Sequence, residues 1–169
     1  MWRRTLGAML SLLFVVGCQT PRAEFQLCEV KSGVFQDEAT VIDLNAGIVR
    51  GSDVSISAKM VRTEFAAGFM TPYPLVLPTV PPNELPPHWE LENYRFTVSS
   101  PQNYPGGWML IDAEPFRAET GKAGARSSVL YSPSKGVVAV QVSGQTPDRI
   151  LTADWVFCGT GTLRGSSFR

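Results

Sequence analysis

The sequence predicts an all-β domain, an antiparallel β-sandwich or a small barrel, with one long proline-rich loop. Segments that alternate apolar and polar residues recur along the chain at fairly regular spacing, as half-buried strands do. Fifteen Gly and thirteen Pro residues punctuate these segments. No window has a sustained helical period with capping residues, so we expect no more than helical turns over residues 64–69 and 115–119. This combination is typical of sandwiches and barrels.

The predicted strands, in chain order, are residues 24–30, 40–44, 48–50, 54–61, 94–99, 108–113, 127–131, 136–142 and 150–157. Residues 54–61 have the cleanest alternation, which predicts one continuous half-buried strand. Residues 137–140 are almost all apolar, so we expect their strand to be buried on both faces. The sequences at residues 45–47 and 132–135 each predict a tight turn between two strands.

Residues 71–88 stand apart because seven of them are proline. Proline fixes φ and has no ladder donor, so this segment cannot be a central strand and should run as a long extended excursion, partly polyproline II. Three interpretations stay open: the segment covers one end of the core, it binds a partner or ligand, or it is disordered. The candidate binding positions are Pro72, Tyr73, Leu75, Leu77, Val80, His88 and Trp89.

The first seventeen residues have the parts of a secretory signal. Arg3 and Arg4 form a positively charged start, and residues 6–16 form an uncharged apolar run of eleven residues. A helix of that length is too short to span a hydrocarbon core of roughly 30 Å. We therefore interpret residues 1–17 as a signal peptide and not as a membrane-spanning helix.

The end of this signal, Val15-Val16-Gly17-Cys18, resembles the bacterial lipobox, in which branched apolar residues and a small residue precede a cysteine. The resemblance implies cleavage before Cys18 and acylation of its thiol and its new amine by fatty chains such as palmitate. Three chains suffice for stable anchoring, whereas one chain binds a bilayer only marginally. Asp after the cysteine would imply retention in the inner membrane. Gln19 follows Cys18, so the resemblance implies a location on the periplasmic face of the outer membrane. An ordinary signal peptide with a chance cysteine is the alternative.

Removal of residues 1–17 leaves 152 of the 169 residues. They form a lipidated tether at residues 18–23 and a single β domain at residues 24–169. Because Arg3 and Arg4 leave with the signal, thirteen basic residues remain against fifteen acidic ones. No stretch clusters Lys and Arg with aromatic residues, so nucleic-acid binding has no electrostatic support.

Two cysteines remain once Cys18 carries lipid, and they lie near the two ends of the domain. An exported protein enters an oxidising compartment, so we expect Cys28 and Cys158 to form a disulfide that ties the first strand to the last. A zinc site is the alternative, but two cysteines and a single histidine make a poor ligand set. A disulfide requires the two Cα atoms to lie within about 7 Å.

Ser132-Pro133-Ser134-Lys135 matches the Ser-x-x-Lys motif of penicillin-binding proteins and β-lactamases. In those enzymes the serine and the lysine share one face of a helix. Here Pro133 and Gly136 bracket the motif and strands flank it on both sides. We therefore interpret it as a hairpin turn and not as a nucleophile.

Two further groups of polar residues were candidates for chemistry. His88, Glu90 and Glu92 would share one face of an extended segment, where they could bind a divalent cation or simply face water. His88 is the only histidine, so any Ser-His-Asp or Cys-His arrangement must use it. Asp112 and Glu114 share a face of a predicted strand, as ordinary solvent-facing residues do. The sequence therefore predicts no catalytic residue, no metal site and no cofactor.

Three functional hypotheses remain, of which the last, an enzyme, has no acid–base or metal set to support it. The first is a membrane-anchored envelope lipoprotein with a non-enzymatic binding or structural role, whose partners are the bilayer through Cys18 and another envelope protein. The alternative is a lipocalin-like carrier of a small apolar ligand, with residues 71–88 as its lid. An enclosed apolar cavity of roughly 300 Å³ or more beneath those residues would favour the carrier. A filled core beside an exposed apolar patch would favour a protein partner.

Overall fold

A computed structural model describes residues 24–31, 34–51, 55–100, 107–116, 124–145, 150–159 and 161–168. Within this part of the chain the fold is an all-β antiparallel sandwich with thirteen strands and one turn of 3-10 helix. The strands are β1 (Glu24–Lys31), β2 (Val34–Asp43), β3 (Ile48–Arg50), β4 (Ser55–Ser57), β5 (Met60–Arg62), β6 (Ala66–Phe69), β7 (Leu75–Pro78), β8 (His88–Leu91), β9 (Tyr94–Ser99), β10 (Met109–Pro115), β11 (Arg126–Ser132), β12 (Gly136–Gln145) and β13 (Ile150–Phe157), followed by η1 (Gly165–Ser167).

Ten of these strands form one long antiparallel sheet in the order β4-β3-β2-β1-β13-β12-β11-β10-β9-β8. Almost every strand lies beside its neighbour in the sequence. The exception is the joint in the middle, where β1 pairs with β13. The edge strands β4 and β8 do not pair with each other, so the sheet is open and the sandwich, not the barrel, is the fold.

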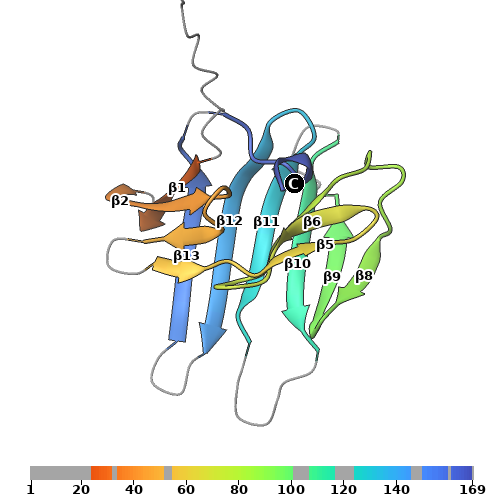
Figure 1. The fold of residues 1–169 in the computed structure, drawn as a ribbon, viewed down its shortest axis with the longest axis horizontal. Coiled ribbons are helices and arrows are strands. Elements are labelled where there is room, and N and C mark those ends of the chain that lie inside the picture. Colours follow the sequence, from red (N-terminus) through yellow and green to blue (C-terminus); the bar gives the residue numbers. More distant parts are fainter. Residues whose placement is uncertain are drawn as a thin grey trace, which may run out of the picture.

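The chain leaves this sheet at β4, on one edge, and returns at β8, on the other. It makes the crossing as a second sheet of three strands in the order β5-β6-β7. Figure 1 shows β1–β4, which are one half of the long sheet, together with β5 and β6, crossing in front of β10–β13. The two layers therefore cross at a steep angle, as in orthogonal sheet packing. The long sheet bends so that it contributes strands to both layers.

The core lies between the two layers, on what we call the inner face of the long sheet. Strand register places Phe96, Ile111, Val129, Val140 and Leu27 on this face, and each side chain is no more than 1% exposed. Their sequence neighbours point to the opposite, outer face because successive residues of a strand alternate. The predicted alternation therefore identifies the inner face correctly.

The proline-rich segment forms part of the cover over this core. Leu75–Pro78 is the strand β7, at the edge of the three-stranded sheet, and its residues are buried. The prediction that the segment is not a central strand is confirmed, and an edge strand suits proline because it needs fewer ladder donors. The prediction of a long extended excursion holds only for β7, since residues 71–73 and 79–87 consist mainly of bends and turns. The hydroxyl of Ser127 on β11 donates a hydrogen bond to the carbonyl of Pro74, which fixes the segment to the long sheet.

Close backbone approach holds β7 in place. A Cβ atom on Gly68 of β6 would collide with the backbone of Leu75 and Val76, and one on Gly165 of η1 would collide with that of Pro78. Only glycine permits these contacts. The C-terminal segment thus packs against the three-stranded sheet, where the ring of Phe168 lies 6.2 Å from that of Phe69.

Two predictions about local structure are wrong. Residues 54–61 are not one strand: Ser55–Ser57 pairs with β3, whereas Met60–Arg62 pairs with β6 in the other sheet. Residues 64–69 are not helical, because the Thr63 hydroxyl accepts a hydrogen bond of 2.9 Å from the amide of Ala66 and starts a turn into β6. Of the second predicted helical turn, Pro115 belongs to β10 and residues 117–119 lie outside the described residues.

The two predicted turns are confirmed. Gly47 has a φ of 63° between β2 and β3, and Gly136 has a φ of 74° where β12 begins after residues 132–135. A positive φ favours glycine at both positions. Asp43 stabilises the first turn, since its carboxylate accepts a hydrogen bond of 2.9 Å from the Ala46 amide.

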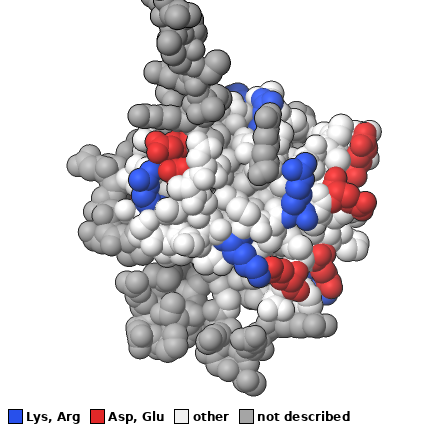
Figure 2. Space-filling view, viewed as in Figure 1, with Lys and Arg blue, Asp and Glu red and all other residues white. Residues whose placement is uncertain are grey.

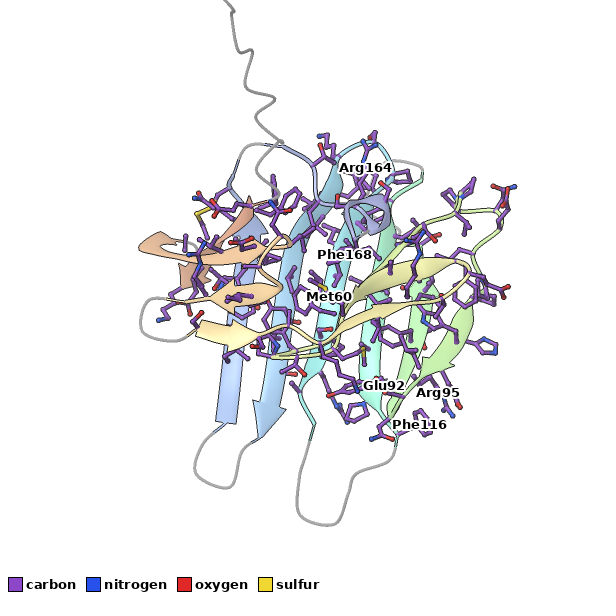
Figure 3. All side chains as sticks on the ribbon, in the orientation of Figure 1. Met60, Glu92, Arg95, Phe116, Arg164 and Phe168 are labelled. Carbon is purple, nitrogen blue, oxygen red and sulfur yellow. A yellow bond between two sulfur atoms is a disulfide. The ribbon has the colours of Figure 1, made fainter. Side chains whose placement is uncertain are left out.

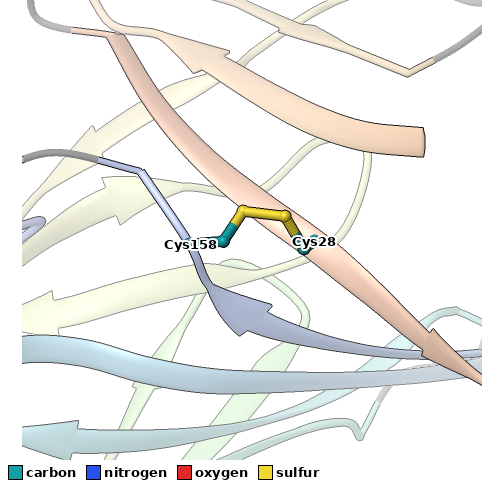
Figure 4. The surroundings of a disulfide bond; sticks show 2 residues. All are labelled: Cys28 and Cys158. Carbon is teal, nitrogen blue, oxygen red and sulfur yellow. A yellow bond between two sulfur atoms is a disulfide. The ribbon is translucent and has the colours of Figure 1, made fainter. Parts of the chain in front are cut away.

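The predicted disulfide is also confirmed. Cys28 and Cys158 are joined by an S–S bond of 2.03 Å with their Cα atoms 5.7 Å apart (Figure 4). Cys28 pairs in register with Val156, so the bond lies on the outer side of the β1–β13 joint. It therefore links the first and last strands at the one place where the sheet is not continuous in sequence.

Candidate functional site

The outer face of the long sheet carries a row of apolar side chains across its four central strands. Leu110, Leu130, Ala139 and Val156 lie opposite one another in register, on β10, β11, β12 and β13. All four are half-buried, whereas polar residues flank them along each strand. We call these residues the outer row. Adjacent strands lie about 4.8 Å apart, so the row extends roughly 14 Å across the sheet.

A hollow of about 480 Å³ lies over the outer row. It is lined by Val30, Leu110, Ser128, Leu130, Ala139, Val140, Gln141, Asp154, Trp155 and Val156. Two hydrogen-bonded pairs occur among its polar residues and their neighbours. The amide of Gln141 donates to the carboxylate of Asp154 at 2.8 Å, and the hydroxyl of Ser128 donates to that of Asp112 at 2.5 Å. The apolar floor thus has one polar edge, whose groups already have partners.

A second hollow, of about 420 Å³, continues along the same face and shares Ser128 with the first. Its lining is polar: Thr97, Asp112, Ala113, Glu114, Arg126, Ser127, Ser128 and Ser143. Arg126 lies 3.7 Å from Glu114 there, and both side chains are exposed. The outer face therefore presents an apolar half beside a polar half.

The proline-rich candidate residues are mainly core residues. Tyr73, Leu75, Leu77 and Trp89 are at most 6% exposed. Tyr73 stacks on Trp155 at 5.3 Å between ring centroids, and Trp89 stacks on Phe96 at 5.2 Å. Pro72 and Val80 are half-buried, and His88 is exposed. Most of this set is therefore buried and does not form a binding surface, and Tyr73 and Trp89 contact different strands of the long sheet, β13 and β9.

The far end of this segment lines a smaller hollow of about 170 Å³. Its lining residues are Pro78, Thr79, Val80, Pro81, Pro82, Met109, Tyr131, Pro133, Arg164 and Ser166. Pockets for drug-sized ligands have volumes of about 300–1,000 Å³. This hollow is below that range, whereas the hollow over the outer row is within it.

The polar candidates for chemistry do not converge. Glu90 pairs with Arg95 at 3.1 Å, and Glu92 pairs with Lys59 at 2.6 Å, so each carboxylate is neutralised by a different strand or loop. His88 and Glu90 are exposed on the outer face of β8. No group of three metal-ligating side chains occurs among the residues that the structure describes.

Asp112 and Glu114 do share the outer face, as predicted, but each has its own partner. Ser128 donates to Asp112, and Arg126 lies beside Glu114. Both groups here lie in an open, polar hollow.

One buried tyrosine has an unusual environment. Tyr73 is 5% exposed, and its hydroxyl has no hydrogen-bond partner within the described residues. Burial raises the pKa of Tyr73 well above its ordinary value of 10. Burial also raises the pKa of Tyr94 and that of Tyr131, and the nearby Arg164 charge partly offsets the shift at Tyr131.

Sequence reasoning missed the outer row, although a signal for it exists. Apolar residues occupy both alternation positions in these strands, as in Leu110 beside Ile111 and Leu130 beside Val129. The prediction that residues 137–140 are buried on both faces came from such a run. It holds only for the inner face, where Val137 and Val140 are 1% exposed; on the outer face Ala139 is only half-buried, so the prediction is wrong there.

Cys18 and the rest of the lipobox lie outside the described residues, so lipidation stays a prediction. Within the described part of the chain, no helix has the length and the apolar character needed to cross a bilayer. No protein-family model, curated protein or solved structure matches the chain. The chemistry of the described residues is therefore the basis for a functional proposal.

Proposed function

We propose that this chain is a membrane-anchored envelope lipoprotein with a non-enzymatic binding role, and that its outer row binds an apolar segment of another envelope protein. The observation that carries the proposal is the hollow of about 480 Å³ over Leu110, Leu130, Ala139 and Val156. Half-buried apolar side chains at the floor of a hollow offer a partner an apolar surface to cover, as interaction sites do.

The shape of the face favours a polypeptide over a small molecule. Ser128, Gln141 and Asp154 lie opposite one another in register and form one polar edge of the apolar floor, and protein interfaces likewise combine apolar and polar area. The adjoining polar hollow extends the same surface. Because β10–β13 each have neighbours on both sides, a partner cannot add a strand there and has to dock through side chains.

The sequence supplies the anchor in this proposal. The signal and Val15-Val16-Gly17-Cys18 predict acylation of Cys18, with the outer membrane, on its periplasmic face, as the address. The disulfide between Cys28 and Cys158 agrees with export, because structural disulfides persist in oxidising compartments.

The second candidate is a carrier of a small apolar ligand, and the volume of the same hollow favours it. In this version the ligand occupies the outer row. Residues 71–88 are unsuited to be its lid, since Leu75 and Leu77 are fully buried in the opposite layer.

Site-specific photocrosslinking separates the two candidates. A photoreactive amino acid replaces Leu130 in the full chain, which is expressed in bacteria and crosslinked in the cell envelope. The mass of the crosslinked adduct is then measured by mass spectrometry. We expect one discrete protein-sized adduct that is lost when Ala139→Lys fills the hollow with a charge. The control carries the probe at Met60, which is 41% exposed on the three-stranded sheet.

An adduct with the mass of a small apolar molecule would identify the carrier instead. The binding proposal fails if Leu130 yields no adduct, or if Met60 yields the same adduct as Leu130.

The anchor has a separate test. Cys18→Ala is expected to abolish acylation, measured by the mass of the N-terminal peptide and by palmitate labelling. Membrane-bound, acylated Cys18→Ala protein would show that the anchor is elsewhere.

A further inference from the structure

We infer that the end of the sandwich at which β1 begins faces the bilayer, and that Lys135, Arg164 and Trp108 contact anionic phospholipid headgroups there. This inference rests on the proposed lipid anchor at Cys18. It adds an orientation to that proposal and names the surface that meets the membrane.

The tether is short. Five residues separate Cys18 from Glu24, the first residue of β1. A fully extended chain covers at most about 3.3–3.6 Å per residue, so Glu24 lies within roughly 20 Å of an acylated Cys18. Since the acyl chains are in the bilayer, the start of β1 has to lie close to the headgroups.

Hydrogen bonds place two other segments at the same end. The amide of Cys158 donates to the carbonyl of Gln26 at 3.1 Å, so the chain after β13 passes beside the start of β1. Further along, the amide of Val137 donates to the carbonyl of Leu163 at 3.0 Å. The guanidinium of Arg164 also donates to the Ser134 carbonyl. The β11–β12 hairpin and the C-terminal segment are therefore neighbours of the tether's attachment point.

The charges at the two ends of the molecule differ. At this end, no carboxylate among the described residues lies within ion-pair distance of Lys135 or Arg164. At the start of β1, the carboxylates of Glu24 and Asp43 share one basic partner, Arg50, at 3.1 and 3.5 Å. Lys135, Arg164 and Arg50 thus give this end three basic side chains against these two acidic ones. Among the described residues that Figure 2 colours, the blue side chains at the very top have no red neighbours, and Figure 3 labels Arg164 at this end.

At the opposite end, basic side chains have acidic partners. Lys59 lies 2.6 Å from Glu92, and Arg95 lies 3.1 Å from Glu90. Figure 3 labels Glu92 and Arg95 at this end, far from Arg164. A negatively charged surface is therefore attracted to the tethered end more strongly than to the other.

The chemistry of the tethered end suits a headgroup layer. The ammonium of Lys135 lies 5.7 Å from the centre of the Trp108 ring, and Lys135 is exposed. Tryptophan is enriched at membrane interfaces because its ring is apolar and its N–H is polar. Lysine and arginine near an anionic leaflet each strengthen binding about fivefold. Together they form a small basic and aromatic surface.

The test compares two lysines of one molecule. The protein purified from membranes is mixed with vesicles of phosphatidylcholine containing 30% phosphatidylglycerol. An amine-reactive reagent that does not cross bilayers then labels exposed lysines, and mass spectrometry measures labelling at Lys135 relative to Lys59. We expect the ratio of labelling at Lys135 to labelling at Lys59 to fall at least about fivefold relative to the protein without vesicles. This factor corresponds to the contribution of one basic residue to binding at an anionic surface.

Two controls make the result specific. The ratio should recover in 1 M salt, where the screening length is about 3 Å, and in vesicles of phosphatidylcholine alone. A Lys135 to Lys59 labelling ratio that is the same with and without anionic vesicles would overturn the inference, as would protection of Lys59 alone. The mass of the N-terminal peptide reports acylation of Cys18 independently, so a failed anchor and a wrong orientation give different results.

Discussion

Ile111 and Leu110 are neighbours on β10 and have side chains of nearly equal volume, yet they serve different faces of the sheet. Ile111 is 1% exposed in the core between the layers, whereas Leu110 is half-buried in the outer row. The inner face is covered by the three-stranded sheet, and within the described residues the outer row has no such cover. The comparison separates residues that hold the fold together from residues that the fold leaves available.

The two faces are also held differently at the β1–β13 joint. On the inner side the joint is packed, with Leu27 fully buried in the core. On the outer side it is crossed by the disulfide between Cys28 and Cys158. Packing and a covalent bond thus stabilise opposite sides of the same pair of strands.

The disulfide should give the largest effect. Its cysteines are 130 residues apart, and closing a loop of that length stabilises a protein by about 5 kcal/mol in the chain-entropy model. We expect the double variant Cys28→Ala, Cys158→Ala to lose most of that free energy of unfolding in urea titrations. Reductant should destabilise the parent and leave the double variant unchanged. A loss below about 1 kcal/mol would mean that packing alone holds the joint.

The Ile111 and Leu110 pair tests the comparison of the faces directly. Ile111→Ala leaves a cavity in a sealed core and should cost about 2–5 kcal/mol. Leu110→Ala removes a partly solvated side chain and should cost about 1 kcal/mol. Both are measured by urea unfolding of the full chain. Equal losses would contradict the distinction, since they would mean that the outer row is as tightly packed as the core.

Tyr73→Phe should stabilise the protein, because the buried hydroxyl of Tyr73 has no partner within the described residues. Removal of such a group is worth about 1 kcal/mol near neutral pH. Since burial raises the pKa of Tyr73, the unfolded chain loses this proton first as pH rises above 10. The parent should therefore become less stable above that pH, by up to about 1.4 kcal/mol per pH unit from this residue.

The advantage of Tyr73→Phe over the parent should grow accordingly in alkaline solution, measured by unfolding at pH 8 and pH 11. A constant difference between the two pH values would indicate that Tyr73 ionises normally in the fold.

The smallest effect is expected at the polar end of the outer face. Arg126 and Glu114 are 3.7 Å apart, with side chains 62% and 64% exposed. Exposed pairs of this kind contribute about 0–1 kcal/mol. Arg126→Ala should therefore change the free energy of unfolding by less than about 0.5 kcal/mol, checked by the same titration. A larger loss would show that the outer face also contributes to stability through its charges.

Much of the fold follows from alternation, and its failures have a common cause. Period-two patterning identifies which side chains face the core, and both sheets of this sandwich face the same core. Residues 54–61 therefore keep one uninterrupted pattern while the chain changes sheets between Ser57 and Met60. The division falls between two hydrogen bonds: the Ala58 amide donates to the Gly47 carbonyl at 2.7 Å, beside β3, whereas the Lys59 carbonyl accepts from the Met70 amide at 2.9 Å, beside β6. These partners lie outside residues 54–61, so the segment itself carries no signal of the change.

The site was harder to predict than the fold. Tyr73 and Trp89 were candidate binding residues because they are large and lie in a proline-rich segment, but such residues are equally suited to a cover over the core. The outer row depends on register across four strands, because Leu110, Leu130 and Val156 become neighbours only through pairing. Single strands display the apolar residues but cannot show that they form one surface.

The pairing of β1 with β13 has a consequence for the order of folding. The first strand meets its partner on that side only when Ile150–Phe157 has been made, near the other end of the chain. Pairings this distant in sequence form slowly, because the intervening chain must first be brought into place. The long sheet can thus assemble as two blocks, β1–β4 and β8–β13, and join only when the chain is nearly complete. A delayed final step of this kind would suit the export that we propose, in which the polypeptide crosses a membrane in extended form before it folds.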